Sequence, residues 1–337
     1  MLRLGIIGCG KVTTMFHLKA IAEVDEVEVV AVADLDRRRM EAVKKKAGAE
    51  RGYLEPGELL EDGDVEAVAV NTPPRFHEGL TLEAIQAGKH VLVEKPLAQT
   101  IEGCKRIRTA LKGSDLVVLP VHNYAFTPCL ERAKGLLSGG EIGGLEGLEV
   151  RFDNNLWSYG AKTDFRMEEP HAIVEDLLPH ILSVAHVLAG PVRRVVGAEG
   201  WVKRYPVFDN LRVELETEGG AAISGEMNWT SLIPGFDVRV RGERGTMSVE
   251  LMKSPYSVSV DTPQGSRKIG GRGLGWLLDL VRLKHPAFVG QYRHLVRAVR
   301  GEELPRFTVE DEGGMLGVMD EVIGLLPERD ITGDGGG

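Results

Sequence analysis

The sequence predicts a protein of the α/β class, in which a doubly wound parallel sheet is followed by an α+β domain with a mostly antiparallel sheet. Three observations lead to this prediction. Short runs rich in Val, Ile and Leu alternate with amphipathic stretches through the first third of the chain. A glycine turn, Gly8-Cys9-Gly10, ends the first of these runs. Strand-like runs with few helical patterns fill residues 192–260, and a chain of 337 residues suits about two domains.

The first third of the chain is predicted to hold five parallel strands with helices between them. The apolar runs are short, continuous and bounded by Gly, Asp, Asn or Pro, as expected for strands buried on both faces. The regular alternation of strand and helix indicates a doubly wound sheet. The predicted strands are Leu2–Ile7, Val27–Ala33, Ala67–Val70, His90–Val93 and Leu116–Val121, and the predicted helices are Val12–Ala22, Arg37–Ala47, Glu78–Ala87 and Ile101–Leu111.

The pattern changes near Tyr124, and the rest of the chain is predicted to form a second domain. Two helices come first, and the longer one stops at Gly190-Pro191. Alternating runs separated by glycine-containing turns then indicate antiparallel strands, before helical patterns return. The predicted elements are helices Cys129–Leu137 and Ile173–Leu188, strands Arg212–Thr217, Ala221–Trp229, Phe236–Arg241 and Thr246–Glu250, and helices Gly275–Leu283, Ala287–Arg300 and Val309–Leu326. The predicted domains are residues 1–122 and 123–328, with 329–337 as a flexible tail.

Composition and charge exclude several classes of protein. Lys and Arg number 41 against 50 Asp and Glu, a net charge of -9, which gives no electrostatic footprint for nucleic acid or an anionic membrane. The three cysteines are widely spaced, which is typical of reduced, intracellular thiols. The first apolar run is too short for a signal peptide or a membrane span, so we expect a cytoplasmic protein. No compact His, Cys or carboxylate motif predicts a metal.

The segment Gly8-Cys9-Gly10-Lys11-Val12-Thr13 predicts a dinucleotide site. A glycine turn between a strand and a helix lets the backbone approach a pyrophosphate, and the helix N-terminus offers free N–H groups. The predicted ligands are Gly8, Gly10, Lys11 and Val12. A threonine stands where the third glycine of the usual pattern would be. The position of the turn between a predicted strand and a predicted helix strengthens the signal.

An acidic residue, Asp34, ends the second predicted strand, twenty-four residues after Gly10. A carboxylate at this place suits the ribose hydroxyls of NAD and repels the additional phosphate of NADP. Arg37 and Arg38 follow and could hold that phosphate, so NAD is favoured and NADP stays possible. The alternative is that Asp34 merely caps the helix that begins near Asp36.

Two further strand ends carry polar residues, Asn71-Thr72-Pro73 and Glu94-Lys95-Pro96. Ligands of open parallel sheets bind at the carboxyl ends of the strands. We therefore expect both segments to lie beside the cofactor. The alternative is that Lys95 is only a residue at a strand end before a structural proline and has no role in binding.

In these segments the sequence resembles the Gfo/Idh/MocA oxidoreductases, the family of glucose-fructose oxidoreductase and inositol dehydrogenase. The matching pieces are the Gly8-Cys9-Gly10 turn, the strand ending at Asp34, the segment from Thr72 to His77, and the stretch Ala87-Gly-Lys-His-Val-Leu-Val-Glu-Lys-Pro-Leu-Ala98. Weaker matches extend to the closing helices. The resemblance implies a Rossmann domain that binds NAD or NADP, a second domain on an open, mainly antiparallel sheet, and a homo-oligomer, dimer or tetramer. It also implies that Lys95 contacts nicotinamide and the reacting hydroxyl, and that His77 lies beside the cofactor.

Asp176 and His180 are the predicted acid–base residues. They are four apart on a predicted helix and so share one face. Oxidation of a secondary alcohol needs a base, which imidazole supplies near neutral pH, and a neighbouring carboxylate can orient the ring. The family resemblance implies the same pair. Lys95 could stabilise the developing alkoxide charge. Family members often have an Asp where this chain has Ser183, and an Arg where it has Ala125.

Four residues are predicted to contact the substrate. His122 and Tyr124 lie at the domain junction, and Trp157 and Arg166 lie in the loop before the long helix. An aromatic ring can stack on a sugar, and an arginine can hold a carboxylate or phosphate. The alternative is that this loop packs on its own domain.

Together these observations predict an NAD(P)-dependent oxidoreductase that moves a hydride between nicotinamide and a secondary hydroxyl of a sugar, polyol or sugar nucleotide. Two alternatives stay open. The protein could be a dinucleotide-binding sensor that has lost the chemistry, or a redox-assisted lyase or hydrolase with tightly held NAD. Net consumption of the cofactor separates the last possibility from a dehydrogenase.

Overall fold

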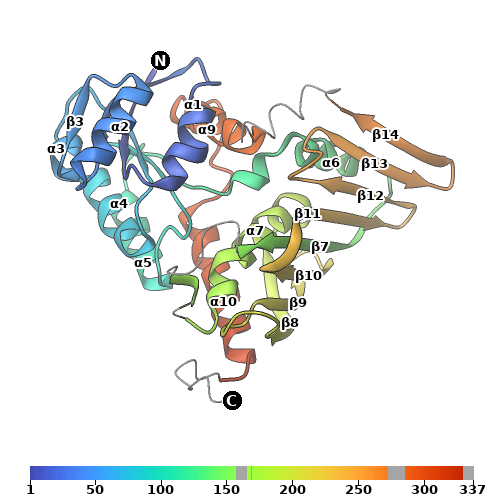
Figure 1. Ribbon diagram of the computed structural model, residues 1–337. Coiled ribbons are helices and arrows are strands. Elements are labelled where there is room, and N and C mark those ends of the chain that lie inside the picture. Colours follow the sequence, from blue (N-terminus) through green and yellow to red (C-terminus); the bar gives the residue numbers. More distant parts are fainter. Residues whose placement is uncertain (157–164, 168, 272–284, 329–337) are drawn as a thin grey trace. The chain divides into compact units, whose positions relative to one another are not determined.

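The computed structural model describes residues 1–156, 165–167, 169–271 and 285–328 (Figure 1). The chain divides into two compact units. The first unit comprises Met1–Phe126 and Gly273–Leu316, and the second comprises Thr127–Arg272 and Gly317–Gly337. Of the described residues, 285–316 thus group with the first unit, whereas the sequence analysis predicted them within the second domain. The predicted helix 275–283 and the predicted tail 329–337 lie outside the described residues.

The first unit is built on a six-stranded, all-parallel sheet with the order β3-β2-β1-β4-β5-β6. This is the strand order of a Rossmann fold. All five strands predicted from the sequence are present, and the additional edge strand, β3, has the sequence Arg-Gly-Tyr, which shows no apolar run. The strands are β1 Leu2–Ile7, β2 Val27–Ala33, β3 Arg51–Tyr53, β4 Ala67–Val70, β5 His90–Val93 and β6 Val118–Pro120.

Helices cover this sheet and connect its strands. The helix predicted over Val12–Ala22 contains a π-helical segment, η1, before a short α-helix, α1. The helical elements of the first unit are η1 Thr13–His17, α1 Leu18–Ile21, α2 Arg37–Ala47, α3 Pro56–Leu60, η2 Pro74–Phe76, α4 His77–Gln86, α5 Ile101–Leu111, η3 Asn123–Phe126 and α9 Pro286–Val299. The last helix, α10 Val309–Leu325, begins in the first unit and ends in the second.

The two faces of the parallel sheet pack against different helices. Leu4 and Ile6 of β1 belong to a buried cluster with residues of α1, α2 and α9, including Tyr292 and Leu295. Gly5 faces the other way, where an added Cβ would lie 2.7 Å from Leu59 Cδ2 of α3. The participation of α9 in this cluster explains why it groups with the first unit.

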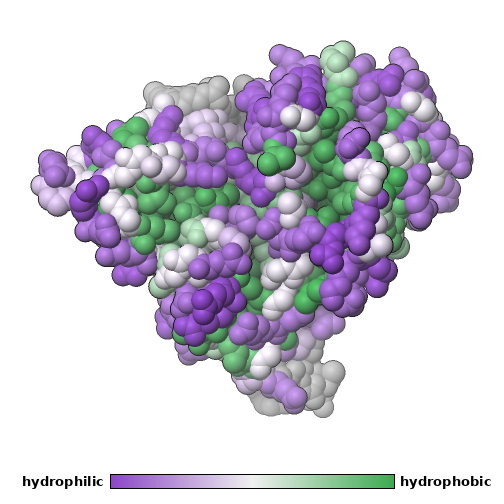
Figure 2. Space-filling view, turned by 180° about the vertical axis from the view of Figure 1, so that it is seen from behind, coloured by the Kyte–Doolittle hydropathy of each residue, from purple (hydrophilic) through white to green (hydrophobic). Residues whose placement is uncertain are grey.

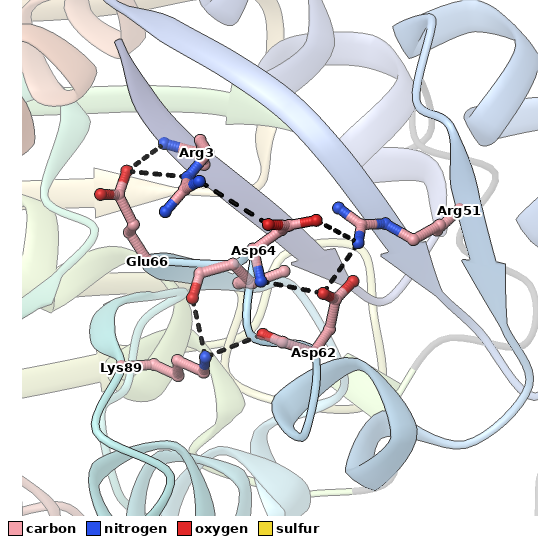
Figure 3. A network of polar contacts seen from close by, with 7 residues as sticks. Arg3, Arg51, Asp62, Asp64, Glu66 and Lys89 are labelled. Carbon is pink, nitrogen blue, oxygen red and sulfur yellow. Dashed lines mark hydrogen bonds and ion pairs between the residues drawn. The ribbon is translucent and has the colours of Figure 1, made fainter.

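Charged side chains tie together the edge of the sheet where its strands begin (Figure 3). Arg51 Nη1 lies 2.9 Å from Asp62 Oδ1 and 2.7 Å from Asp64 Oδ2. Lys89, which is only 8% exposed, donates from Nζ to the carbonyl oxygens of Asp62 and Val65, at 2.9 and 2.7 Å. The strands' carboxyl ends, where the candidate site residues lie, are at the opposite edge.

The second unit is built on an eight-stranded sheet with the order β14-β13-β12-β11-β7-β10-β9-β8 (Figure 1). Every neighbouring pair is antiparallel except β7 and β10, which run parallel. The antiparallel sheet confirms the predicted fold class, although β7, β8, β13 and β14 were not among the individual strands that were predicted. The strands are β7 Leu145–Asn155, β8 Val192–Trp201, β9 Asn210–Thr217, β10 Ala222–Asn228, β11 Thr230–Gly242, β12 Gly245–Glu250, β13 Ser257–Thr262 and β14 Gly265–Gly270.

Helices α6 Pro128–Ser138 and α7 Ala172–Ala189 pack on one face of this sheet, and η6 Phe165–Met167 precedes α7. The contact of α7 with β10 is close, since a Cβ added at Gly225 would lie 3.4 Å from Ile181 Cδ1. By length and composition alone α7 could span a membrane. Most of it is buried, however, as in the core helix of a globular domain.

The other face of the eight-stranded sheet is charged. Along β7, Leu148, Val150 and Phe152 are buried, while Glu149 and Arg151 between them are exposed. The molecular surface seen in Figure 2 is likewise mostly hydrophilic, with hydrophobic side chains gathered in separate areas.

Candidate active site

The glycine turn after β1 needs glycine at Gly8 for two reasons. Its φ of +97° is disfavoured for residues with a side chain, and an added Cβ would lie 2.7 Å from the carbonyl oxygen of Asn71. At Gly10 an added Cβ would meet nothing within 4 Å. The backbone at Gly10 therefore borders open space, as a turn that cradles a pyrophosphate requires.

Thr13 occupies the place of the third glycine and uses its side chain to brace the turn. Its buried hydroxyl donates to the carbonyl oxygen of Gly8 at 2.6 Å and accepts from Asn71 Nδ2 at 3.2 Å. The turn after β1 is thus tied to the end of β4. The sequence departure at Thr13 strengthens the turn instead of breaking it.

Asp34, at the end of β2, turns its carboxylate toward the glycine turn. Oδ2 accepts from the backbone N–H of Cys9 at 2.7 Å, and Oδ1 accepts from that of Asp36 at 2.8 Å. Asp36 is the N-cap residue of α2, and its side chain accepts hydrogen bonds from Arg38 N and Arg39 N. The alternative that Asp34 caps the helix is therefore not what the structure shows. Arg38, proposed as a phosphate ligand, lies exposed in the first turn of α2.

Cys9, within the turn, is not a nucleophile. Burial, helped by the charge of Asp34, raises the pKa of its thiol to about 12. A thiol with such a pKa stays protonated and unreactive at neutral pH. Cys9 is therefore a small packing residue of the turn.

Glu94, Lys95 and Pro96 directly follow β5, and Lys95 is half-buried. Glu94 is bound by His17 of η1, a histidine that no sequence motif singled out, and His17 Nε2 lies 2.8 Å from Glu94 Oε1. At the start of α4, His77 is buried, and its two ring nitrogens each lie 2.7 Å from a carbonyl oxygen, of Thr72 after β4 and of Pro96 after β5. The ring of His77 thus braces the two strand ends.

These residues fit a dinucleotide. The space beside Gly10 is open, and Asp34 places a carboxylate at the turn for ribose hydroxyls. Asn71 Oδ1 and Thr72 Oγ1 are buried and make no hydrogen bond with the described part of the chain. Buried polar atoms are normally paired, so these two are available to a bound ligand.

In the second unit, Asp176 is held by Arg166 and Trp229. Arg166 donates from Nε and Nη2 to the two carboxylate oxygens of Asp176, at 2.8 and 3.1 Å, and Trp229 donates from Nε1 to Oδ2 at 3.3 Å. The side chains of Arg166 and Asp176 are only 21% and 11% exposed. Arg166, expected to bind an anionic part of the substrate, therefore directs its guanidinium at Asp176 instead.

His180 lies one helical turn after Asp176 on α7. Its ring makes an edge contact with Phe152 of β7, with the ring centroids 5.5 Å apart. Ser183, where family members often have an Asp, is buried and donates to the carbonyl oxygen of His180 at 3.0 Å. The side chain of Ser183 thus forms a hydrogen bond within α7, to the helix backbone.

The remaining predicted substrate residues differ in their surroundings. His122 is buried, with Nε2 bonded to the carboxylate of Glu312 and its ring against Phe307, so the structure gives no support to its predicted contact with substrate. Tyr124, in η3, is half-buried and makes an edge contact with the ring of His285. Trp157 lies outside the described residues. The described ranges contain no cluster of three or more His, Cys, Asp or Glu able to hold a metal.

The fold and the turn define a class, the oxidoreductases with an NAD-binding Rossmann domain. Residues 2–122 match the family model for the oxidoreductase family with an NAD-binding Rossmann fold, and residues 130–248 match the GFO/IDH/MocA C-terminal domain. The chain belongs to the Gfo/Idh/MocA oxidoreductase family, which confirms the resemblance seen in its sequence.

Known relatives and solved structures agree with this assignment. The chain is 32% identical over 257 residues to inositol 2-dehydrogenase 1 of Saccharopolyspora erythraea, covering 74% of each chain. It is 26% identical over 318 residues to myo-inositol 2-dehydrogenase of Thermotoga maritima, covering 92% of each. The fold is similar to that of an Agrobacterium radiobacter oxidoreductase in complex with NAD+, L-tartaric acid and magnesium, with a TM-score of 0.84, 20% identity and 96% coverage of both chains.

Proposed function

We propose that this protein is an NAD-dependent dehydrogenase that oxidises a secondary hydroxyl of a sugar or polyol, or reduces the corresponding ketone. One observation carries the proposal: Asp34 bonds to the glycine turn after β1, and the segment with Lys95 follows β5 of the same parallel sheet, from which β1 is separated by β4 alone. Two relatives named as inositol dehydrogenases support a polyol substrate. The carboxylate of Asp34 favours NAD over NADP.

The residues divide the chemistry between them. NAD, when bound, supplies the acceptor for the hydride at C4 of nicotinamide. His180 accepts the hydroxyl proton as the hydride and its two electrons leave the carbon, and it returns this proton in the reverse direction. Lys95 positions the hydroxyl oxygen and stabilises its developing negative charge. The reaction therefore converts an alcohol to a ketone and releases one proton to His180.

Asp176 is proposed to orient His180. Arg166 and Trp229 fix the carboxylate of Asp176, one helical turn before His180 on α7. A carboxylate fixed in this way can stabilise the imidazolium formed during the reaction. Arg166 would then serve the acid–base pair and not the substrate.

We also propose that the protein is a cytoplasmic homo-oligomer, a dimer or tetramer. The widely spaced, buried cysteines support a reducing compartment. The exposed, charged face of the eight-stranded sheet offers a surface for self-association. Light scattering after size-exclusion chromatography measures the oligomeric state.

The test is single-turnover absorbance of reduced nicotinamide. Enzyme at high concentration is mixed with NAD or NADP and with pooled inositols, sugars and sugar nucleotides. We expect reduction with NAD and a polyol, and we expect Lys95→Ala and His180→Ala to abolish turnover while the dissociation constant for NADH stays within about threefold. Lys105→Ala, at an exposed lysine paired with Glu102, is the matched control.

Three outcomes distinguish the candidate functions. Turnover that survives in Lys95→Ala or His180→Ala contradicts the assigned roles. Cofactor binding without reduction in any pool favours the sensor. Substrate conversion without net NADH favours the redox-assisted lyase or hydrolase.

A further inference from the structure

Two buried histidines contact the residues on either side of Lys95. His17 Nε2 lies 2.8 Å from Glu94 Oε1, and His77 Nδ1 lies 2.7 Å from the carbonyl oxygen of Pro96. Both rings are buried, at 0% and 1% exposure. We propose that His17 and His77 are positioning residues that hold this segment from both sides, so that the ammonium group of Lys95 keeps one place beside the dinucleotide turn. The proposal rests on the role proposed above for Lys95.

The hydrogen bonds of His17 have a defined direction. Burial would raise the pKa of Glu94, but the hydrogen bond from His17 and the charges of His17, Lys95 and His77 lower it below its ordinary value. Glu94 is therefore a carboxylate that only accepts, and His17 Nε2 donates to it. His17 Nδ1 lies 2.8 Å from the hydroxyl of Tyr292. Burial and the charge of Glu94 raise the pKa of that phenol well above its ordinary value, so it keeps a proton to donate to Nδ1.

Aromatic neighbours prevent the ring of His17 from turning. Phe288 of α9 meets it edge-on with the centroids 5.0 Å apart, and Tyr292 does so at 5.8 Å. Phe16 stacks on Phe288, at 5.4 Å. Since both nitrogens are bonded and the ring is packed on α9, His17 holds Glu94 in one place.

His77 acts from the other side of Lys95. Its Nε2 lies 2.7 Å from the carbonyl oxygen of Thr72, at the end of β4, and its Nδ1 lies 2.7 Å from that of Pro96. Carbonyl oxygens only accept, so both contacts are hydrogen bonds when both ring nitrogens carry hydrogen. The charge of His77 is one of the causes that lower the pKa of Glu94.

The same helical segment also holds the dinucleotide turn. Thr13 and His17 are four residues apart in η1 and both are completely buried. Thr13 bonds to Gly8 in the turn and to Asn71 after β4, while His17 bonds to Glu94 after β5. One face of η1 therefore links the cofactor turn to the segment that carries the proposed reactive lysine.

The first test measures amide hydrogen exchange of a peptide covering residues 94–98, without substrate. We expect His17→Leu and His77→Leu to speed exchange there by about tenfold, because the segment loses its anchors. His90→Leu is the matched control, since His90 begins β5, at the opposite end from Lys95, and its Nδ1 accepts from Val117 N. It should leave exchange of residues 94–98 unchanged.

Two milder variants keep the test decisive if a leucine variant does not fold. His17→Gln retains an N–H donor for Glu94 and should preserve slow exchange. Tyr292→Phe removes only the hydroxyl that fixes Nδ1 of His17 and should speed exchange by a few-fold. Unchanged exchange in Tyr292→Phe together with either leucine variant would overturn the proposal.

The second test separates positioning from folding. With a substrate that the wild-type enzyme turns over, kcat of His17→Leu and His77→Leu should fall by about 100-fold, the effect of a small misplacement of a reactive group. Binding of NADH should change by less than about threefold, and His17→Gln should restore most of kcat. Wild-type kcat in His17→Leu despite faster exchange would overturn the proposal. If no substrate is found, the function proposed above fails while the exchange experiment still decides whether the histidines hold the segment.

Discussion

Replacement of Asp34 by Asn tests the cofactor site without a substrate. The carboxylate accepts from two backbone N–H groups, of Cys9 at 2.7 Å and of Asp36 at 2.8 Å. An amide of the same shape can accept only one of them, and its NH2 group faces the other donor. The side chain in Asp34→Asn would therefore be neutral and turned away from the position that the carboxylate holds.

The expected loss follows from the charge on the acceptor. A hydrogen bond to a charged group contributes about 1.5–3 kcal/mol, against about 1 kcal/mol for a neutral pair. Replacing a carboxylate by an amide under the ribose hydroxyls should therefore cost roughly 1.5 kcal/mol, or about tenfold in the dissociation constant for NADH. NADPH gains at the same time, because the charge that repels its phosphate is gone. The ratio of the two dissociation constants should shift by more than about tenfold toward NADPH.

The assay is a titration of nicotinamide fluorescence with NADH and NADPH. Asp36→Asn is the matched control: it makes the same change in charge two residues away, and Asn caps a helix as well as Asp does. An unchanged dissociation constant for NADH in Asp34→Asn, or an equal loss in Asp36→Asn, would refute the assignment of Asp34 to the ribose.

Three further predictions concern stability and reactivity. Arg166→Leu leaves the largely buried Asp176 without its bidentate partner and should cost about 3 kcal/mol of unfolding free energy. Arg194→Leu, which breaks an exposed pair with Glu216, should cost less than about 1 kcal/mol, and equal urea midpoints for the two variants would contradict this. Lys89→Met keeps the buried stem but removes two hydrogen bonds and leaves the carbonyl oxygen of Val65 without its donor, whereas that of Asp62 still accepts from Val65 N. We expect the free energy of unfolding, measured in urea, to fall by about 2 kcal/mol, and a fall of less than about 0.5 kcal/mol would contradict this. Burial raises the pKa of the thiols of Cys9, Cys104 and Cys129 to about 12, so all three are protonated at neutral pH. A thiol reagent at neutral pH should therefore label them only after the protein unfolds. Labelling of the native protein would contradict their burial.

Local sequence patterns predicted the first unit well. The continuous apolar runs gave four strands with the bounds that the structure has, β1, β2, β4 and β5. These strands are buried on both faces, so their hydrophobicity is strong over a few residues. The edge strand β3, Arg51–Tyr53, has half-buried residues only, and such a strand leaves no comparable pattern.

The second unit was predicted less completely. The strand β7, Leu145–Asn155, was missed although it alternates buried and exposed residues from Leu148 to Phe152. Its parallel pairing with β10 joins segments some seventy residues apart, which no local pattern encodes. The packing of α9 with the first unit was not foreseen either, because an amphipathic helix shows that it packs but not on which core.

For the candidate site, too, some residues were identified from local sequence patterns, while their partners were visible only in the structure. The sequence by itself determined the glycine turn, Asp34 and Lys95, because glycines in a strand-to-helix turn and polar residues at strand ends have few other uses. Only the tertiary structure decided their partners, because a hydrogen bond depends on where two distant segments meet and not on either segment alone. It joined His17 to Glu94 across 77 positions of the chain, and it directed Arg166 to Asp176.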